Sequence, residues 1–334
     1  MRFSLRLNND LPLDDYRRLA VAAEDAGFDQ LWVSHDLFLR SAPVLVAAMA
    51  AVTRRLSLGI GILNPYTQSP AEIAMTAATL DELSGNRFLL GLGAGAADFL
   101  EWVGIEQARP LAAVAESMAA IRALLSGETG AVHGRHLRWS EQCYLRFAAP
   151  RTTPIYLGAM GPRMLELAGR AADGALPLLF PPEHLHSVRP LIARGIAARD
   201  PELPPFDLAA CVWLSLADDP AAARRPLAEK IAYYGRSLGP LILERLGLER
   251  AAFEPIHRAL HRDRDLERAV ALVDERMLAI GVAGDPDAVI SRLSTLLDAG
   301  VRHLSFGPPL GPDPLVAVEL LGRRVLPALR AAVS

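Results

Sequence analysis

The chain has 334 residues, of which 51% are hydrophobic and 22% charged, a composition that can bury a large core and differs from that of disordered chains. Its net charge is −3 and its basic residues are spread along the sequence, so we expect no nucleic-acid partner. The most conspicuous apolar run, Val44 to Val52, is too short to cross a bilayer, and the N-terminal sequence lacks the features of a signal peptide. With Cys143 and Cys211 as its only cysteines, the protein is expected in the cytoplasm, away from membranes and without disulfides.

Short apolar runs followed by amphipathic stretches recur about eight times along the chain, and this pattern is typical of parallel βα units. Most of the runs are apolar throughout, as strands covered on both faces must be. The pattern predicts a (β/α)8 barrel with strands at Arg2–Leu7, Gln30–Ser34, Leu56–Leu63, Phe88–Gly93, Pro154–Gly158, Gly174–Phe180, Leu208–Leu216 and His303–Phe306.

Helix boundaries between these strands carry local signals. An apolar stripe predicts a helix over Leu13–Ala26 that ends at Gly27. The sequence from Ser69 to Glu72 forms a capping box, and Gly85 closes that helix. Asp285 followed by proline has the pattern of another N-cap.

Two stretches interrupt the pattern. Residues 128–147 contain no clear helix and suggest a β-hairpin insertion over the barrel mouth or edge. Residues 227–277 are helical, rich in arginine and too long for one βα connection, so we expect an additional helical insertion. Nothing marks a second domain, and the whole chain, 1–334, is predicted to be one barrel domain.

In such barrels the site lies at the C-terminal ends of the strands, and polar and glycine residues gather there. The turn Gly158–Gly161 precedes a helix predicted over Arg163–Ala172, whose N-terminus can bind a phosphate; in the alternative, the glycines only supply positive φ in a tight turn. The run from Gly91 to Ala96 superficially matches a dinucleotide fingerprint, yet the next helix is expected only near Pro110. We expect these glycines to let a flat ring approach the strand end.

Three long segments together resemble one known family. They are AEDAGFDQLWVSHD (23–36), NPYTQSP continuing to ATLDELSGNRFLLGLGAG (64–70 and 78–95), and PIYLGAMGPRMLELAGRAADGAL (154–176). The chain resembles the bacterial luciferase-like superfamily, and within it the coenzyme F420-dependent methylenetetrahydromethanopterin reductases. The likeness covers the first 180 residues closely and the rest in outline.

The resemblance implies a barrel that binds coenzyme F420, an 8-hydroxy-5-deazaflavin, at the strand ends, with its phosphate near the turn 158–161. It also implies a cis peptide between Gly61 and Ile62 and a homodimer formed through early helices, which fits the apolar face at Ala47–Val52. The candidate cofactor-binding residues are Ser34, Gly61, Ile62, Asn64, Gly93, Ala94, Gly95, Gly158, Ala159, Met160 and Gly161.

The candidate catalytic residues are Arg6, His35 and Asp36. Alternation along the first strand places Arg6 inside the barrel near its top, where it either contacts the site or forms an internal ion pair with Asp36 or another acid. His35 and Asp36 are either a proton-transfer pair or a hydrogen-bonded loop anchor.

This sequence departs from the methanogen reductases at substrate-facing positions. The methanogen enzymes carry glutamate where this chain has Arg6 and glutamine where it has Met160, and they place the acid before the histidine in the pair that is His35–Asp36 here. Their pterin is therefore a doubtful substrate, while Arg6 can pair with an anionic group.

The favoured function is hydride transfer between the deazaflavin C5 and an unsaturated C=C or C=N bond of a small molecule. A reduced-FMN monooxygenase and a non-catalytic flavin-binding barrel stay open as alternatives. The histidine pairs 133/136, 184/186 and 257/261 lack the acids or cysteines that would complete a metal site, so none is expected. Trp102, Trp139 and Trp213 fit core or interface packing better than stacking on a ring.

Overall fold

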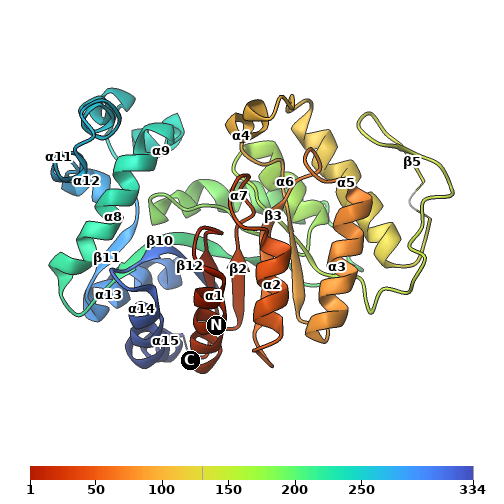
Figure 1. Cartoon of the computed structure of the whole chain (residues 1–334), viewed down its shortest axis with the longest axis horizontal. Helices are drawn as coiled ribbons and strands as arrows, with labels where there is room; N and C mark the ends of the chain where they lie inside the picture. Colours follow the sequence, from red (N-terminus) through yellow and green to blue (C-terminus); the bar gives the residue numbers. More distant parts are fainter. Residues whose placement is uncertain (130, 334) are drawn as a thin grey trace.

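The computed structural model describes residues 1–129 and 131–333. Within them, eight parallel strands form a barrel around which the helices are arranged (Figure 1). The ring order is β1 (Arg2–Leu7), β2 (Gln30–Val33), β3 (Ser57–Leu63), β4 (Phe88–Leu92), β7 (Ile155–Leu157), β8 (Gly174–Ala175), β9 with β10 (Asp207–Leu208 and Ala210–Leu216) and β12 (His303–Leu310). β12 pairs with both β10 and β1, and β8 pairs with β9, which only Ala209 separates from β10. The predicted barrel is confirmed.

The helices follow the strands along the chain. They are α1 (Leu13–Asp25), α2 (Ala42–Ala50), α3 (Pro70–Ser84), α4 (Ala97–Trp102), α5 (Pro110–Leu125), α6 (Pro162–Ala171), α7 (Leu185–Ile196), α8 (Pro220–Tyr234), α9 (Pro240–Arg245), α10 (Glu254–His257), α11 (Leu266–Ala271), α12 (Glu275–Leu278), α13 (Pro286–Asp298), α14 (Pro314–Leu320) and α15 (Leu326–Ala331). Turns of 3₁₀ helix lie at Pro182–His184, Gly235–Ser237 and Arg250–Phe253, and π-helical turns lie at Arg258–Arg262 and Leu321–Val325. No described helix is both long and apolar enough to span a membrane.

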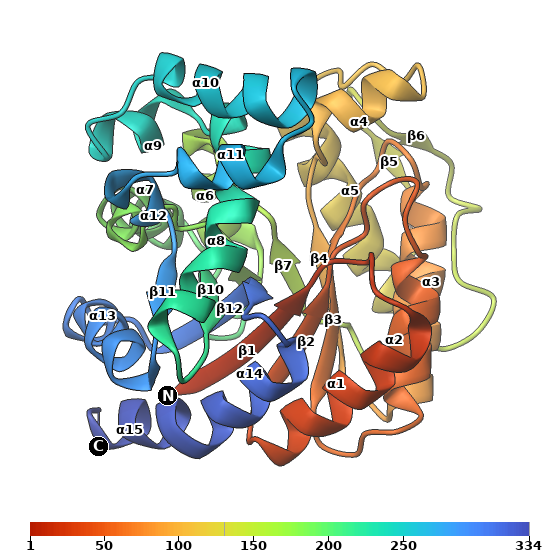
Figure 2. The ribbon, with the colours of Figure 1, turned by 60° about the vertical axis from the view of Figure 1, so that its left-hand side comes forward.

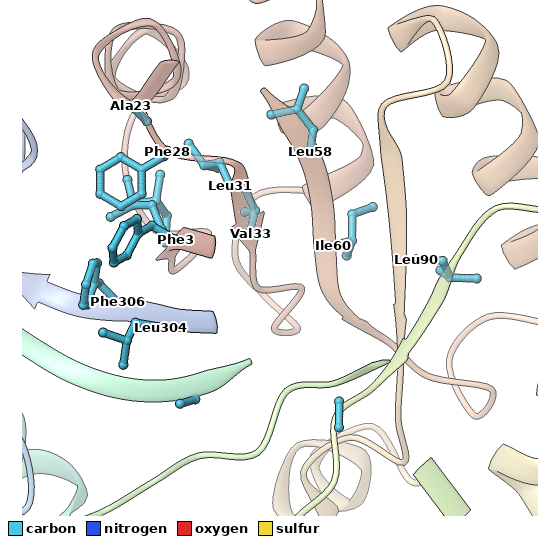
Figure 3. Packing of buried hydrophobic residues seen from close by; sticks show 14 of the residues in the cluster. Phe3, Ala23, Phe28, Leu31, Val33, Leu58, Ile60, Leu90, Leu304 and Phe306 are labelled. Carbon is cyan, nitrogen blue, oxygen red and sulfur yellow. The ribbon is translucent and has the colours of Figure 1, made fainter. Parts of the chain in front are cut away.

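The main hydrophobic core lies between the strands and the surrounding helices. Phe3 and Phe306 stack with ring centroids 6.2 Å apart, and Phe28 meets Phe306 edge-on (Figure 3). Leu31 and Val33 of β2 belong to the same buried cluster. Because side chains alternate along a strand, the residues between them point into the barrel.

The upper part of the barrel interior holds large side chains that neighbouring glycines accommodate. The strand pairing aligns Arg6 with Trp32 and Trp32 with Gly59. A Cβ atom on Gly59 would lie only 2.3 Å from the Trp32 ring, so β3 needs glycine there to let the indole lie across the interior. Arg6 and Trp32 thus fill the barrel interior near the C-terminal ends of the strands. Their outward-facing sides form the floor of the pocket described below.

A buried polar network joins four strands on the opposite side of that layer. The Asp207 carboxylate accepts hydrogen bonds from Tyr156 (2.7 Å) and Arg2 (2.6 Å) and lies 2.9 Å from Nδ1 of His303, while Nε2 of His303 lies 2.9 Å from the Ser4 hydroxyl. Burial raises the pKa of Asp207, but the His303 hydrogen bond and the charges of His303 and Arg2 outweigh it and lower the pKa to about 2. The network ties together β9, β12, β1 and β7 where the barrel closes.

Most predicted boundaries hold in the structure. The Ser69–Glu72 capping box is present, Gly85 ends α3 with φ of 66°, and the Asp285 side chain caps α13. The sixth strand is shorter than predicted, because Pro177 has no N–H to donate to a sheet ladder; only Gly174–Ala175 is strand, with an isolated bridge from Leu178 to Cys211.

Three local features differ from expectation. β12 extends four residues beyond the predicted Phe306, and a short strand, β11 (Val282–Gly284), pairs with the end of β10. The six-residue helix α4 begins at Ala97, well before Pro110. Short elements of this kind lack the periodicity that identifies longer ones.

The two irregular segments lie on the periphery (Figures 1 and 2). Within 128–147, β5 (Val132–His133) pairs antiparallel with β6 (Arg138–Trp139). Helices α8 to α12 enclose a separate hydrophobic cluster that includes Leu227, Phe253 and Met277. Figure 2 shows α9, α10 and α11 on the same side as α4, away from both termini. The extents of one domain and two insertions stay predictions, and residues 130 and 334 within them lie outside the described residues.

Candidate functional site

A pocket of about 1160 Å³ lies where the strands end. Segments from the first five strands of the ring and the helices α5 and α6 contribute to its wall. Of the residues singled out from sequence, those that line it are Arg6, His35, Asp36, Gly61, Ile62, Asn64, Ala94, Gly95, Gly158, Ala159, Met160 and Gly161. The barrel therefore gathers residues that are up to 155 positions apart in the chain.

Arg6 lies at the pocket floor without an acidic partner. No ion pair joins it to Asp36 or to another acid in the part of the chain that the structure describes, and its Nε atom is buried without a hydrogen-bond partner. A Cβ atom on Gly307 would lie 2.3 Å from the Arg6 guanidinium, so glycine on β12 makes the room that this side chain occupies. A half-buried guanidinium without an acidic partner is suited to an anionic ligand.

His35 and Asp36 line the pocket and also anchor the loop after β2. The backbone N–H of Ala42 donates to Nδ1 of His35 (3.2 Å), which leaves Nε2 to carry the proton of the neutral ring. Burial lowers the pKa of His35, opposed by the Asp36 charge, and burial raises the pKa of Asp36. The Ser34 hydroxyl lies 3.2 Å from Oδ2 of Asp36 and 3.2 Å from Oδ1 of Asn9, and it can donate to either oxygen. Ser34 lies behind the wall and does not line the pocket.

The end of β3 supplies one wall. The Gly61–Ile62 peptide is cis, as the resemblance implies. The Oδ1 atom of Asn64 accepts hydrogen bonds from the N–H groups of Tyr66 and Thr67 (3.1 and 3.0 Å), so this buried side chain shapes the loop that follows.

The glycines of the segment 91–95 make room for protein atoms. A Cβ atom on Gly91 would lie 2.2 Å from the Ile60 carbonyl oxygen, and one on Gly93 would press on Ile62 and on the Gly158 carbonyl. Gly95, with φ of 77°, packs beside Asn64. Gly93 does not line the pocket, and the close approaches here are between strands.

The turn 158–161 opens the pocket toward α6. Neither Gly158 nor Gly161 has positive φ, so the tight-turn alternative does not explain them. A Cβ atom on Gly158 would lie 2.8 Å from Ile62, whereas one on Gly161 would meet nothing within 4 Å. Gly158 is required by packing, while Gly161 leaves open space at the N-terminus of α6, where backbone N–H groups favour anions.

This chain is similar to known proteins along nearly its whole length. The family model described as luciferase-like monooxygenase matches residues 1–303. The chain belongs to this family. A 5,10-methylenetetrahydromethanopterin reductase of Archaeoglobus fulgidus is 31% identical to this chain, and the match covers 99% of this chain and the full length of the reductase. An F420-dependent glucose-6-phosphate dehydrogenase of Nakamurella multipartita is 31% identical over 95% of this chain and 92% of its own.

A solved structure shows the same relationship. The coenzyme F420-dependent tetrahydromethanopterin reductase of Methanopyrus kandleri superposes with a TM-score of 0.91 at 30% identity, covering 98% of this chain and 99% of that one. The superposition covers nearly the whole chain, including the barrel strands.

Sequence reasoning missed a group of arginines at the pocket rim. Arg109 precedes α5, Arg135 comes from the 128–147 segment, and Arg163 and Arg170 lie on α6; all four line the pocket and are exposed. None forms an ion pair with a described acid. Arg163 stands directly after the Gly161–Pro162 turn, which is a usable signal, whereas nothing local in the sequence brings Arg135 to this rim.

Trp32 also lines the pocket and was not singled out, although alternation along β2 places it inward beside Gln30. Of the tryptophans considered from sequence, Trp213 packs against Phe180 with ring centroids 4.2 Å apart and the rings tilted by 35°, and Trp102 is 67% exposed near Phe99. No group of three or more histidine, cysteine or acidic residues among the described residues is arranged to hold a metal.

The Ser4–His303–Asp207 series has the order of a nucleophile, base and acid. Ser4 is fully buried and none of the three lines the pocket. A substrate cannot reach the hydroxyl, and the series is part of the network that closes the barrel.

Proposed function

We propose that this protein is a coenzyme F420-dependent oxidoreductase that transfers hydride between the deazaflavin C5 and a C=C or C=N bond of a small organic substrate. The observation that carries the proposal is the pocket at the strand ends, open at Gly161 and rimmed by unpaired arginines. Relatives about 31% identical over nearly the whole chain are named as enzymes of this cofactor class, which supports the choice.

The residues present fit a planar ring with an anionic tail. The N-terminus of α6 together with Arg163 and Arg170 would hold the tail phosphate. The apolar wall from Ile62, Trp32 and Leu176 would exclude water from the ring. When bound in its reduced form, the deazaflavin supplies the hydride.

In the reaction, the residues of the chain position the substrate and fix where the imidazole proton lies. His35 presents a neutral ring with a proton on Nε2 toward Gln68, whose Oε1 atom is buried without a partner. Turning the Gln68 amide would let that oxygen accept the His35 proton and fix the imidazole. Arg6 would orient the substrate, and the departures at Arg6 and Met160 support a substrate other than the methanogen pterin.

The cofactor test is a titration of the purified protein with F420 and, separately, with FMN, followed by fluorescence. The proposal predicts saturable F420 binding at least tenfold tighter than FMN binding. Tighter FMN binding would instead favour the reduced-FMN monooxygenase. Single-turnover oxidation of bound reduced F420 by candidate unsaturated compounds distinguishes an enzyme from a silent binding protein.

We also propose a homodimer in the cytoplasm. Support comes from the exposed apolar side chains of α2 and α3, where Val44 is 60%, Met75 51% and Leu83 54% exposed, with Val52 nearby. Light scattering at several concentrations tests the assembly. The variant Val44→Asp should shift the mass to that of one chain, with the exposed Val316→Asp as control.

A further inference from the structure

Lys230 is the only lysine among 35 basic residues; the other 34 are arginines. Arginine serves the surface ion pairs of this chain, including Arg225–Glu229 on the same helix, α8. An ammonium group is compact and can release its proton, whereas a guanidinium is planar and stays charged. Position 230 therefore stands out as one where a different cation is used.

Lys230 is half-buried between aromatic rings. Its Nζ atom lies 5.0 Å from the ring centroid of Trp213 and 5.0 Å from that of Tyr234. Trp213 is 8% exposed and is itself packed against Phe180. The rings hold the ammonium by cation–π attraction, and no described carboxylate forms an ion pair with it.

The strand register places Arg6 at the level of Trp213, the ring that the Lys230 ammonium faces. Trp213 pairs with Gly307 on β12, and Gly307 is the residue whose Cβ atom would collide with the Arg6 guanidinium. Trp213, Gly307 and Arg6 thus lie at one level on three adjacent strands. Burial lowers the pKa of Lys230 to about 8; the Arg6 charge lowers it too, and Asp10 and Asp36 act in the opposite direction.

Asp10 and Asp36 partly offset these two cations, but no described acid forms an ion pair with either of them, so an anion that joins both would be favoured. In the eight-stranded ring, β1 stands four strands from β7, so Arg6 lies across the pocket from the Gly158–Gly161 turn. There are therefore two separate cationic regions, one at α6 and one at Arg6, which lines the pocket floor; Lys230 belongs to the second region but lies outside the pocket lining.

We propose that Lys230 and Arg6 together bind an oxyanion of the substrate, a carboxylate or phosphate, on the side of the mouth opposite the cofactor tail. The inference rests on the proposed function, because it assumes that the α6 side holds the cofactor. It assigns the substrate to the acidic small molecules.

The single lysine makes a direct test possible without knowing the substrate. Reductive methylation with ¹³C-formaldehyde labels only Lys230 and the N-terminal amine and keeps their charge. The variant Lys230→Met assigns the two signals in a proton–carbon spectrum. We expect the Lys230 signal to be displaced by the two aromatic rings and to shift saturably with sodium phosphate and sodium acetate, but not with sodium chloride.

Two variants locate the anion. The response should be lost in Arg6→Gln and retained in Gly161→Val, which alters the α6 side only. An unresponsive Lys230 signal, a response that survives Arg6→Gln, or one that disappears in Gly161→Val would each overturn the proposal. F420 binding, measured on the unlabelled protein, reports separately on the proposed function, and its retention in Arg6→Gln shows that the variant is folded.

Discussion

Single glycines decide what the mouth of this barrel can accept. Gly158 and Gly161 stand three residues apart in one turn but have different surroundings, since only Gly158 lies against another side chain. A side chain added at position 158 is therefore expected to disturb packing, whereas one added at position 161 is expected to interfere with the ligand.

The variant Gly161→Val should weaken F420 binding at least tenfold and leave the melting temperature nearly unchanged, because the added atoms enter open space. Gly158→Val should instead lower the free energy of unfolding by about 1–3 kcal/mol through overpacking against Ile62. Fluorescence titration and thermal denaturation measure the two effects. Normal F420 affinity in Gly161→Val would remove this turn from the binding site.

At the scale of elements, buried carboxylates connect parts of the barrel that are distant in sequence. Asp81 of α3 is fully buried and accepts two hydrogen bonds of 3.0 Å from Arg151, one of 2.7 Å from Thr153 and one from the N–H of Phe88. The helix is thereby tied to β4 and to the segment entering β7.

Asp81→Ala should lower the free energy of unfolding by about 3–5 kcal/mol, since it leaves the donors of Arg151 and Thr153 without their acceptor. The control is Glu166→Ala, which breaks an exposed pair with Arg194 and should cost less than about 1 kcal/mol. Urea unfolding measures both. Similar losses in the two variants would contradict this account of α3.

Asp207 makes barrel closure sensitive to acid. Its pKa in the folded protein is about 2, below the value of 3.8 that it has without these contacts, so its contribution is complete above about pH 4 and is lost as the pH falls toward 2. The shift corresponds to roughly 2 kcal/mol. Asp207→Asn should lose about this stability at pH 7 and show a weaker decline between pH 4 and 2. Urea unfolding across this range, with Asp14→Asn as an exposed control, tests the assignment.

The order of strands and helices was predictable, because strands buried on both faces and capped helix ends both require recognisable residue types close together in the sequence. Capping at Ser69 and Asp285 is a short-range event, and the sequence indicated both. What escaped prediction depends on contacts between distant segments: β11 forms only because β10 offers an edge, and Arg135 reaches the pocket only through the fold of its segment. The sequence marks Lys230 as its only lysine, but the two aromatic rings beside this side chain come from β10 and the end of α8.

At the scale of the whole molecule, we expect the local charge at the pocket mouth to influence ligand binding more than the net charge of −3 does. The rim arginines give one side of the pocket a local positive potential that the negative net charge of the chain does not reveal. Such exposed charges act over about 10 Å and are screened by salt.

F420 affinity should therefore fall several-fold when sodium chloride rises from 50 to 500 mM, and Arg163→Ser should both weaken binding and reduce this dependence. Arg18→Ser, which removes an exposed arginine on α1, serves as the control. Fluorescence titrations at several salt concentrations give the slopes. A slope in Arg163→Ser equal to that of the unaltered protein would show that the rim does not contact the anion.

Both chain ends lie on the face away from α4 and the α9–α11 helices (Figure 2). There the guanidinium of Arg330 donates to the Gly27 carbonyl and lies over the Phe3 ring, which fixes the last helix beside the first strand. An affinity tag, a fluorescent fusion or a tether to a solid support attached at either terminus would accordingly leave the approach to the ligand free. The fold is thus well suited to immobilised biocatalysis and surface-based binding assays.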